Sequence, residues 1–304
     1  MGEGAGAMTR VVAVLTCFNR RESTLRCLGL LESAARAAGV EPAAVLVDDG
    51  STDGTAQAVG ERFPWVDVLR GGGNLFWNRG MHRGLEHVYA RRDFDHVLWL
   101  NDDTHLLPDA LVRLLDTASD LRQHLGREAI VVGATADPST GRITYGGKSR
   151  GSRWRPFQFR TVADDVAAQP CDTMNGNVVL VPQQIALDVG NLDPTFEHSM
   201  GDIDYGLRAR RKGHPLYVAA GIVGHCRSNS VEGTHRDTSL PLAARWRRLT
   251  SRKELPPRSW LRLTSRHGGL LWPLHFMWPY AKVLMSGAIG SATPKNGTKG
   301  SEKA

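Results

Sequence analysis

Short apolar runs alternate with longer amphipathic segments over the first 135 residues. The runs are rich in Val and Leu and have the length of strands buried on both faces; they span residues 11–15, 43–47, 66–70, 96–100 and 129–134. The segments between them place apolar residues at helical spacing; they span residues 21–38, 55–62, 78–90 and 108–125. Regular alternation of strand and helix predicts an α/β domain built on a parallel sheet.

The pattern is less regular after residue 135. The apolar run at 178–181 predicts a further strand, another apolar run spans 217–223, and no internal repeat is evident. Leu255-Pro256-Pro257 marks a break, after which residues 260–285 are apolar and aromatic with flanking arginines. Two prolines and a lysine interrupt that stretch, so it lacks the clean apolar run of about 20 residues that a transmembrane helix needs.

Two of the predicted strands end in adjacent carboxylates. Asp48 and Asp49 follow the second run, and Asp102 and Asp103 follow the fourth. In an open α/β sheet, ligands bind in the crevice beyond the carboxyl ends of the strands, so we expect both pairs at one site. Carboxylates without neighbouring Cys or His suit Mg²⁺ or Mn²⁺, which bridge to substrate phosphates. For the first pair, a turn followed by a helix cap is the alternative.

Composition and charge narrow the class of protein. The chain has 304 residues, 41% of them hydrophobic, which is enough for one large core with an appendage. Its formal net charge is +7, and the basic residues concentrate after residue 205. This uneven distribution argues against a nucleic-acid partner and favours an anionic surface, formed by lipid headgroups or by a phosphorylated substrate.

The four cysteines show neither metal-ligand spacing nor a compact disulfide framework, which favours a reducing compartment. The first apolar run has the length of a strand, and no cleavable signal is visible before it. We therefore expect a cytoplasmic protein.

Four motifs stand in a fixed order along the chain. They are Val14–Arg20 (VLTCFNR), Val47–Asp53 (VDDGSTD), Leu100–Thr104 (LNDDT) and Gly201–Arg208 (GDIDYGLR). Together they resemble the motifs of family 2 glycosyltransferases over residues 10–230, and rhamnosyltransferase-like members in particular. The resemblance implies the GT-A fold, a single nucleotide-sugar-binding α/β domain, and inverting sugar transfer that uses Mg²⁺ or Mn²⁺ as cofactor.

The resemblance also implies which residues form the donor side of the site, where a UDP- or dTDP-sugar would bind. Thr16 and Phe18 would line the nucleoside pocket and Asp49 would bind the base edge; a core position is the alternative for Phe18. Asp103 matches the metal-binding carboxylate of the family's Asp-x-Asp motif, whose first position is Asn101 here. The nucleotide and donor candidates are Thr16, Phe18, Asn19, Arg20, Asp48, Asp49, Asn74, Trp77, Arg79, Gly80, Asn101 and Asp102.

Residues 71–80 (GGGNLFWNRG) follow the third predicted strand and open a helix. Their backbone N–H groups would approach a phosphate or sugar closely, and a turn capped into a helix is the alternative. By resemblance, Asn74, Trp77 and Arg79 lie beside the donor. His225 matches a histidine that binds the metal or the diphosphate in relatives, which makes Asp103 and His225 the metal candidates; a structural histidine is the alternative.

Asp202 matches the catalytic aspartate of the family's Glu-Asp-x-Asp motif, in which Gly201 replaces the glutamate. An inverting transfer needs a carboxylate that takes the proton of the acceptor hydroxyl as that oxygen attacks the anomeric carbon. The acceptor-side candidates are Asn175, Gly176 and Asp204. For Asp204, an ion pair with Arg208 at i,i+4 is the favoured structural alternative.

These assignments predict a domain organisation. A disordered amino terminus (1–9) precedes a GT-A catalytic domain (10–235), which consists of a nucleotide-sugar half (10–135) and an acceptor half (136–235). A basic, aromatic helical extension (236–285) and a disordered tail (286–304) follow. We expect the extension to lie on an anionic membrane surface, with Trp260, Trp272 and Trp278 at headgroup level. The alternative is a helical hairpin packed on the catalytic domain or on a second copy, as in a homodimer.

The sequence therefore predicts a metal-dependent, inverting glycosyltransferase of bacterial surface-polysaccharide synthesis. It would act on a glycan or lipid-linked acceptor as a peripheral protein of the inner face of the cell membrane, with Asp202 as general base. One alternative is a sugar-phosphate nucleotidyltransferase, but Thr16-Cys17-Phe18-Asn19 stands where that class has a Gly-rich basic loop. The other is a non-catalytic, membrane-associated protein that binds nucleotide sugars; the presence of Asp102, Asp103 and Asp202 argues against it.

Overall fold

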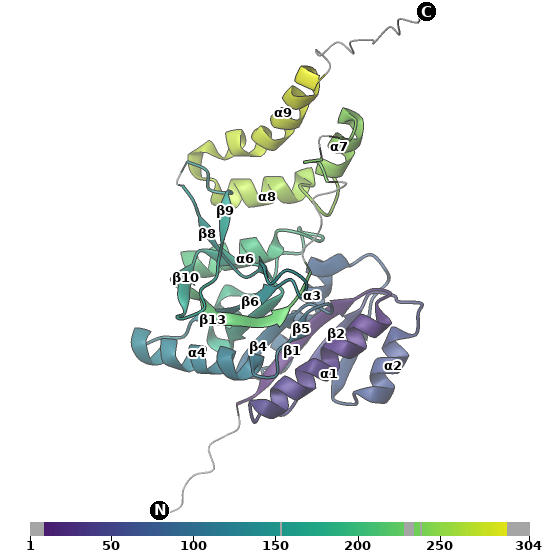
Figure 1. Ribbon diagram of the computed structural model, residues 1–304, viewed down its shortest axis with the longest axis vertical. Coiled ribbons are helices and arrows are strands. Elements are labelled where there is room, and N and C mark those ends of the chain that lie inside the picture. The colour runs from purple at the N-terminus through teal and green to yellow at the C-terminus, as the bar shows by residue number, and fades with distance from the viewer. Residues whose placement is uncertain (1–8, 153, 228–233, 238, 291–304) are drawn as a thin grey trace, which may run out of the picture. The chain divides into compact units, whose positions relative to one another are not determined.

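The computed structural model describes residues 9–152, 154–227, 234–237 and 239–290. The chain divides into two compact units, residues 1–229 and residues 230–304, which are described separately (Figure 1). All four cysteines are buried, and none of them forms a disulfide.

The first unit contains a mixed sheet in which β10, β13, β6, β12, β4, β1, β2 and β3 are neighbours in that order. The predicted strands of the first half are present as β1 (Val11–Cys17), β2 (Ala44–Asp48), β3 (Val66–Arg70), β4 (His96–Leu100) and β6 (Ile130–Ala136). Strands β4, β1, β2 and β3 run parallel, so their carboxyl ends meet at one edge of the sheet.

The sheet is not entirely parallel, which differs from the sequence-based expectation. Strand β12 (Val178–Pro182) lies antiparallel between β4 and β6, and Val178 is paired with Leu100. The chain reaches the carboxyl end of β4 at Asn177, whose carbonyl accepts the Asn101 N–H at 3.0 Å, so it can only run back along β4. The other strands of this sheet are β5 (His105–Leu106), β7 (Ile143–Tyr145), β10 (Gln169–Cys171) and β13 (Leu216–His225).

Helices cover both faces of this sheet (Figure 1). Helices α1 (Arg21–Ala37), α2 (Thr55–Arg62) and α4 (Ala110–Leu125) pack on one face, where Leu28, Leu46 and Leu114 belong to one buried cluster. Helices α3 (Phe76–Arg91), α5 (Gln183–Val189) and α6 (Gly201–Arg211) pack on the other, with Met81 and Trp99 in a second cluster. Successive strand residues alternate between the two clusters because side chains alternate across a strand.

A small antiparallel sheet adjoins α6 in this unit. It consists of β8 (Gly147–Arg150), β9 (Phe159–Val162) and β11 (Thr173–Met174), with β8 in the middle. A Cβ on Gly206 of α6 would lie 2.4 Å from Thr173 Oγ1, so the helix approaches β11 closely only because that position is glycine. Strand β11 leads directly into residues 175–177, next to the end of β4.

The second unit consists of α7 (Leu242–Leu249), α8 (Pro257–His267), a 3₁₀ turn, η1 (Gly269–Leu271), and α9 (Trp272–Gly290). The predicted break at residues 255–257 is confirmed, because α8 begins at Pro257. Trp260 is buried in the contact between α8 and α9, and its Nε1–H donates to the Phe276 carbonyl at 3.1 Å. The expectation that Trp260 lies at a membrane surface is therefore wrong.

No helix in the described part of the chain combines the length and the hydropathy that crossing a membrane requires. Helix α9 continues to Gly290, so residues 286–290 of the predicted disordered tail are helical. The remainder of that tail, and residues 1–8 of the predicted disordered amino terminus, lie outside the described residues.

Candidate active site

The parallel strands bring the predicted donor-side residues to the carboxyl edge of the sheet. The loop after β1 carries Phe18, whose side chain is 52% exposed, so its alternative role as a core residue is excluded. Asn19 has a positive φ of 50° and joins this loop to the next one: its N–H donates to Ser51 Oγ, and its Oδ1 accepts the Thr52 N–H, each at 2.8 Å. Thr16 packs against Gly80 of α3, where a Cβ would lie 2.4 Å from Thr16 Oγ1.

Asp48 and Asp49 are buried and organise the loops around them. Asp48 Oδ1 accepts the Ser51 N–H at 2.9 Å, which closes the turn after β2. The Asp49 carboxylate accepts three backbone N–H groups, from Gly73 and Leu75 at 2.8 Å and from Phe76 at 3.1 Å. It therefore binds the Gly-rich loop and the first residues of α3, where the helix dipole also favours negative charge.

The carboxylates after β4 face an arginine from the start of α1. Arg20 Nη1 lies 2.9 Å from Asp102 Oδ1 and 2.9 Å from Asp103 Oδ2. Burial raises the pKa of the Asp102 carboxyl to about 6, and the positive charge of Arg20 opposes that rise. The Asp103 side chain is 40% exposed, whereas that of Asp102 is 7% exposed. Asp103 is therefore the carboxylate of the pair that a ligand can reach.

The end of β13 lies beside Asp103. Cys226 Sγ is 3.7 Å from Asp103 Oδ1, and the adjacent His225 has a buried Nδ1 atom without a hydrogen-bond partner in the described structure. A buried polar atom normally has a hydrogen-bond or metal partner. Asp103 and His225 are side chains of types that can bind a divalent cation; diphosphate and water oxygens would have to complete the shell of such an ion. Among the described residues, no three His, Cys, Asp or Glu side chains form a group suited to a metal.

Trp77, in the first turn of α3, connects the donor side to the acceptor side. Its Nε1–H donates to Asn101 Oδ1 at 2.7 Å. A Cβ on Gly176 would lie 2.5 Å from two atoms at the edge of the Trp77 ring, so the indole can approach residue 176 this closely only because that residue is glycine. Gly176 N–H in turn donates to Asp202 Oδ2 at 3.0 Å. One indole therefore joins the metal motif, through Asn101, to the peptide group that holds Asp202.

Asp202 stands at the first turn of α6. Its Oδ1 accepts its neighbour Ile203 N–H at 2.8 Å, in addition to the bond from Gly176. Desolvation raises the pKa of Asp202, and these backbone donors and the Lys148 charge partly offset that rise. The carboxylate is thus held in a fixed orientation and binds a proton more readily than an ordinary aspartate does.

Gly201 fits against Asn78, a buried residue of α3 for which the sequence gives no signal except its place beside Trp77. A Cβ at position 201 would lie 1.6 Å from Asn78 Oδ1. Asn78 Nδ2 donates to the carbonyls of Asp193 and Phe196, at 2.9 and 2.7 Å. Asn78 therefore ties α3 to the segment before α6, and the space beside its carbonyl admits only glycine. The glutamate of the family motif does not fit in this geometry.

The remaining candidate residues differ in their burial and in their hydrogen-bond partners. Asp204 is fully buried and accepts Arg208 Nε at 2.8 Å, which is the ion pair offered above as its structural role. Arg79 Nε donates to the Pro194 carbonyl at 3.1 Å, whereas Asn74 is exposed. Asn175 has a buried Oδ1 without a hydrogen-bond partner in the described structure and precedes Gly176.

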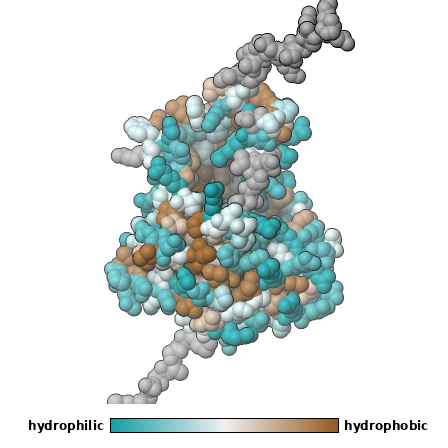
Figure 2. Space-filling view, viewed as in Figure 1, coloured by the Kyte–Doolittle hydropathy of each residue, from teal (hydrophilic) through white to brown (hydrophobic). Residues whose placement is uncertain are grey.

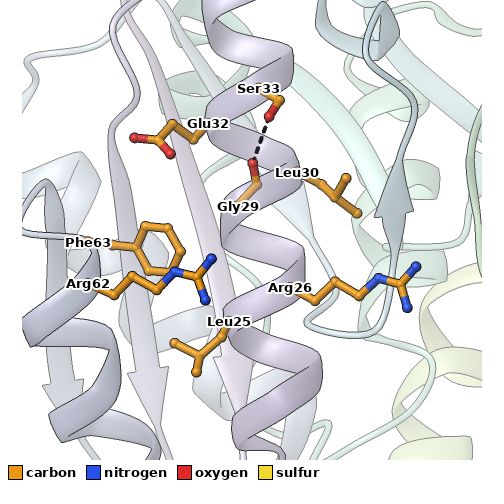
Figure 3. A pocket seen from close by; sticks show the side chains of 8 residues that line it. All are labelled: Leu25, Arg26, Gly29, Leu30, Glu32, Ser33, Arg62 and Phe63. Carbon is orange, nitrogen blue, oxygen red and sulfur yellow. Dashed lines mark hydrogen bonds between the residues drawn. The ribbon is translucent and has the colours of Figure 1, made fainter.

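A pocket between α1 and α2 contains none of these residues (Figure 3). Leu25, Gly29 and Phe63 line its apolar wall, and Arg26 and Arg62 lie at its sides. It has no carboxylate pair and no exposed backbone N–H cluster from the Gly-rich loop. We therefore place the candidate site at the carboxyl edge of the sheet and not in this pocket.

The chain is similar to known proteins over most of its first unit. The sequence model of "Glycosyl transferase family 2" matches residues 12–170. Two curated relatives, from Mycobacterium tuberculosis strains CDC 1551 / Oshkosh and ATCC 25618 / H37Rv, are each called N-acetylglucosaminyl-diphospho-decaprenol L-rhamnosyltransferase. Each is 28% identical to this chain over 224 residues, which is 66% of this chain and 70% of the relative.

The contact between Gly201 and Asn78 leads to a test of stability. Gly201→Ala should lower the free energy of unfolding by about 1–3 kcal/mol, because the added methyl group overlaps Asn78 Oδ1. Thermal and urea unfolding measure the change. Gly60→Ala is the matched control: nothing lies within 4 Å of its Cβ position in α2, so it should be neutral or stabilising by up to about 1 kcal/mol. An equal effect of the two substitutions on the free energy of unfolding would contradict the contact. In a protein that already carries Asn78→Ala, Gly201→Ala should be less destabilising.

Proposed function

The chain belongs to glycosyl transferase family 2, and from this premise we propose that it is an inverting, metal-dependent transferase that moves a deoxysugar such as L-rhamnose from a UDP or dTDP donor to a lipid-linked acceptor. The observation that carries the proposal is the Trp77 bridge. The Trp77 Nε1–H donates to Asn101, which directly precedes Asp102 and Asp103, and its ring contacts Gly176, whose N–H donates to Asp202. A transferase needs carboxylates in both places, one beside the leaving diphosphate and one beside the attacking hydroxyl.

Asp202 is the general base in this proposal. Its Oδ atoms accept backbone N–H groups from Gly176 and Ile203, so the carboxylate keeps a fixed direction while it takes the proton of the acceptor hydroxyl. The hydroxyl oxygen then attacks the anomeric carbon from the face opposite the nucleotide, which inverts the configuration. The raised pKa of Asp202 suits a base that must bind a proton in the transition state.

On the donor side, the exposed ring of Phe18 offers a face for the nucleobase, and Arg20 supplies a fixed positive charge beside Asp103. A divalent cation held by Asp103 and His225 would neutralise charge on the leaving diphosphate. Asp49 supports this side indirectly, because it orders the Gly-rich loop that the donor would contact.

The names of the relatives support the acceptor part of the proposal. Both relatives are named as rhamnosyltransferases of a decaprenyl-diphosphate-linked N-acetylglucosamine. An acceptor of this class is an amphiphile that stays in a membrane, so we propose that this protein works at the inner face of the cell membrane in surface-polysaccharide synthesis.

Donor binding can be tested by thermal shift with UDP-, dTDP- and GDP-sugars, each with and without Mn²⁺. One nucleotide class should raise the melting temperature in a metal-dependent way, because a ligand at about one hundred times its Kd stabilises by about 2.7 kcal/mol. Asp103→Ala should abolish the metal-dependent part. Asp116→Ala, an exposed aspartate on α4, should leave it unchanged. If no nucleotide shifts the wild-type protein, the assigned donor site is wrong.

Replacement of the proposed base should separate catalysis from binding. Asp202→Asn should lower the transfer rate by about 10²–10⁴-fold, while donor affinity changes little. Radiolabelled transfer to a lipid-linked N-acetylglucosamine acceptor measures the rate, and calorimetry measures the affinity. If Asp202→Asn lowered the transfer rate and the donor affinity by the same factor, Asp202 would act in donor binding and not as the base.

The pH profile of the wild-type enzyme should report the same carboxylate. Only the deprotonated base is active, so kcat/KM falls as the pH drops through the raised pKa of Asp202. The acid limb should therefore have its midpoint above the value of about 3.9 that an ordinary aspartate shows. A midpoint at or below the ordinary value would argue against Asp202 as the base.

A further inference from the structure

Helix α9 presents an apolar stripe to solvent. Tyr280 and Val283 face inward and are buried, so this helix already uses one face for the packing of its own unit. The outward residues recur at helical spacing, and about half or more of each is exposed: Leu274 by 67%, Met277 by 56%, Trp278 by 62%, Leu284 by 50% and Met285 by 49%. A surface helix of a soluble protein normally has a polar outer face, and this stripe contains no charged side chain.

The adjoining turn extends the stripe. Leu270 of η1 is 99% exposed and Leu271 is 45% exposed. Brown, hydrophobic residues are correspondingly visible on the surface of the part formed by α9 (Figure 2). Large, contiguous apolar surface of this kind marks a site of interaction with a protein or a membrane, whereas single exposed apolar residues do not.

Positive charge accompanies the stripe. Residues 230–304 contain 13 Lys and Arg against four Asp and Glu, a formal net charge of +9, whereas residues 1–229 contain 25 and 27, a net charge of −2. Within the described residues 242–286, Glu254 is the only acidic side chain, and it contacts His235. Arg258 and Arg262 are exposed on α8, on the same side as Leu261, and Lys282 flanks the stripe on α9.

Apolar and positive surface together favour one partner. A second copy of the chain would bring two units of net charge +9 against each other, which opposes association through this face. An anionic bilayer meets both features, because its acyl boundary accepts Leu, Met and Trp side chains and its headgroups attract Arg and Lys. Trp278 is also the residue type that settles at the boundary between headgroups and acyl chains.

We propose that η1 and α9 form a membrane-docking face, in which Leu270, Leu274, Met277 and Trp278 enter the interface of an anionic bilayer while Arg258 and Lys282 contact its headgroups. The docking is an interfacial one, since no described helix spans a membrane. It goes beyond the proposed transfer reaction: lipid binding by this unit does not depend on the donor, the acceptor or the base. For a lipid-linked acceptor, it would hold the enzyme at the surface where that acceptor lies.

The test is co-sedimentation of the full-length protein with phosphatidylglycerol-rich vesicles and with pure phosphatidylcholine vesicles. The protein should bind the anionic vesicles, and Leu274→Ser/Trp278→Ser should weaken that binding at least about tenfold, from the loss of two inserted side chains. Trp154→Ser is the matched control, because Trp154 is 79% exposed in the other unit and should not contribute. Arg258→Gln/Lys282→Gln should weaken binding about fivefold per charge and only on anionic vesicles at low salt.

Three outcomes would overturn the proposal. One is that the wild-type protein binds neither kind of vesicle, and another is that Leu274→Ser/Trp278→Ser binds as the wild type does. The third is that analytical ultracentrifugation without lipid detects a dimer, and that Leu274→Ser/Trp278→Ser converts this dimer to a monomer. That result would mean that the stripe binds a second copy of the chain. Transfer to a short-chain, water-soluble acceptor should be unaffected by the double substitution, so failure of the docking face and failure of the proposed reaction give different results.

Discussion

The Asp49 carboxylate is the contact on which the arrangement of the site depends. By accepting the N–H groups of Gly73, Leu75 and Phe76, it fixes the point at which α3 begins. The next two residues of that helix are Trp77, which reaches Asn101 and Gly176, and Asn78, which fits against Gly201. Donor-side and acceptor-side residues thus take their positions from one buried carboxylate, although Asn101 and Gly201, for example, lie 100 positions apart in the chain. Replacing Asp49 would leave three N–H groups without their partner and release the start of α3.

The same edge of the sheet carries charge that does not favour folding. Asp102 is buried next to Asp103, and desolvation of the first carboxylate raises its pKa to about 6. The Arg20 guanidinium forms ion pairs with both carboxylates. Because this arginine is half exposed, the ion pairs offset only part of the desolvation energy of the carboxylates. Apolar residues at these positions would stabilise the fold more. The arrangement makes physical sense if the carboxylates serve a ligand, because functional sites are where local stability rules are broken.

The local hydrophobic pattern was sufficient to predict β1, β2, β3, β4 and β6, because a buried strand or an amphipathic helix can be recognised from a few consecutive residues. It also predicted the strand at 178–181 but not its antiparallel direction as β12, which depends on where the preceding small sheet ends. The Asn78–Gly201 contact was equally invisible, because it joins two helices through one atom and leaves no periodic trace. Trp260 was misplaced for the same reason: an aromatic residue in an Arg-rich segment fits a membrane surface and a helix–helix contact alike, and only the packing against α9 decides.

The absence of a glutamate at position 201 has a consequence for the acceptor side. A second carboxylate beside Asp202 would raise the pKa of the base further and would repel an anionic acceptor. Here that position is glycine, and the nearby charge that acts on Asp202 is the positive one of Lys148. An acceptor that carries a diphosphate, as the proposed function requires, would meet less negative charge than in a site with the full motif. The close fit of Gly201 to Asn78 positions the first turn of α6, and the lack of a carboxylate at position 201 would suit the anionic, lipid-linked acceptor of the proposed function.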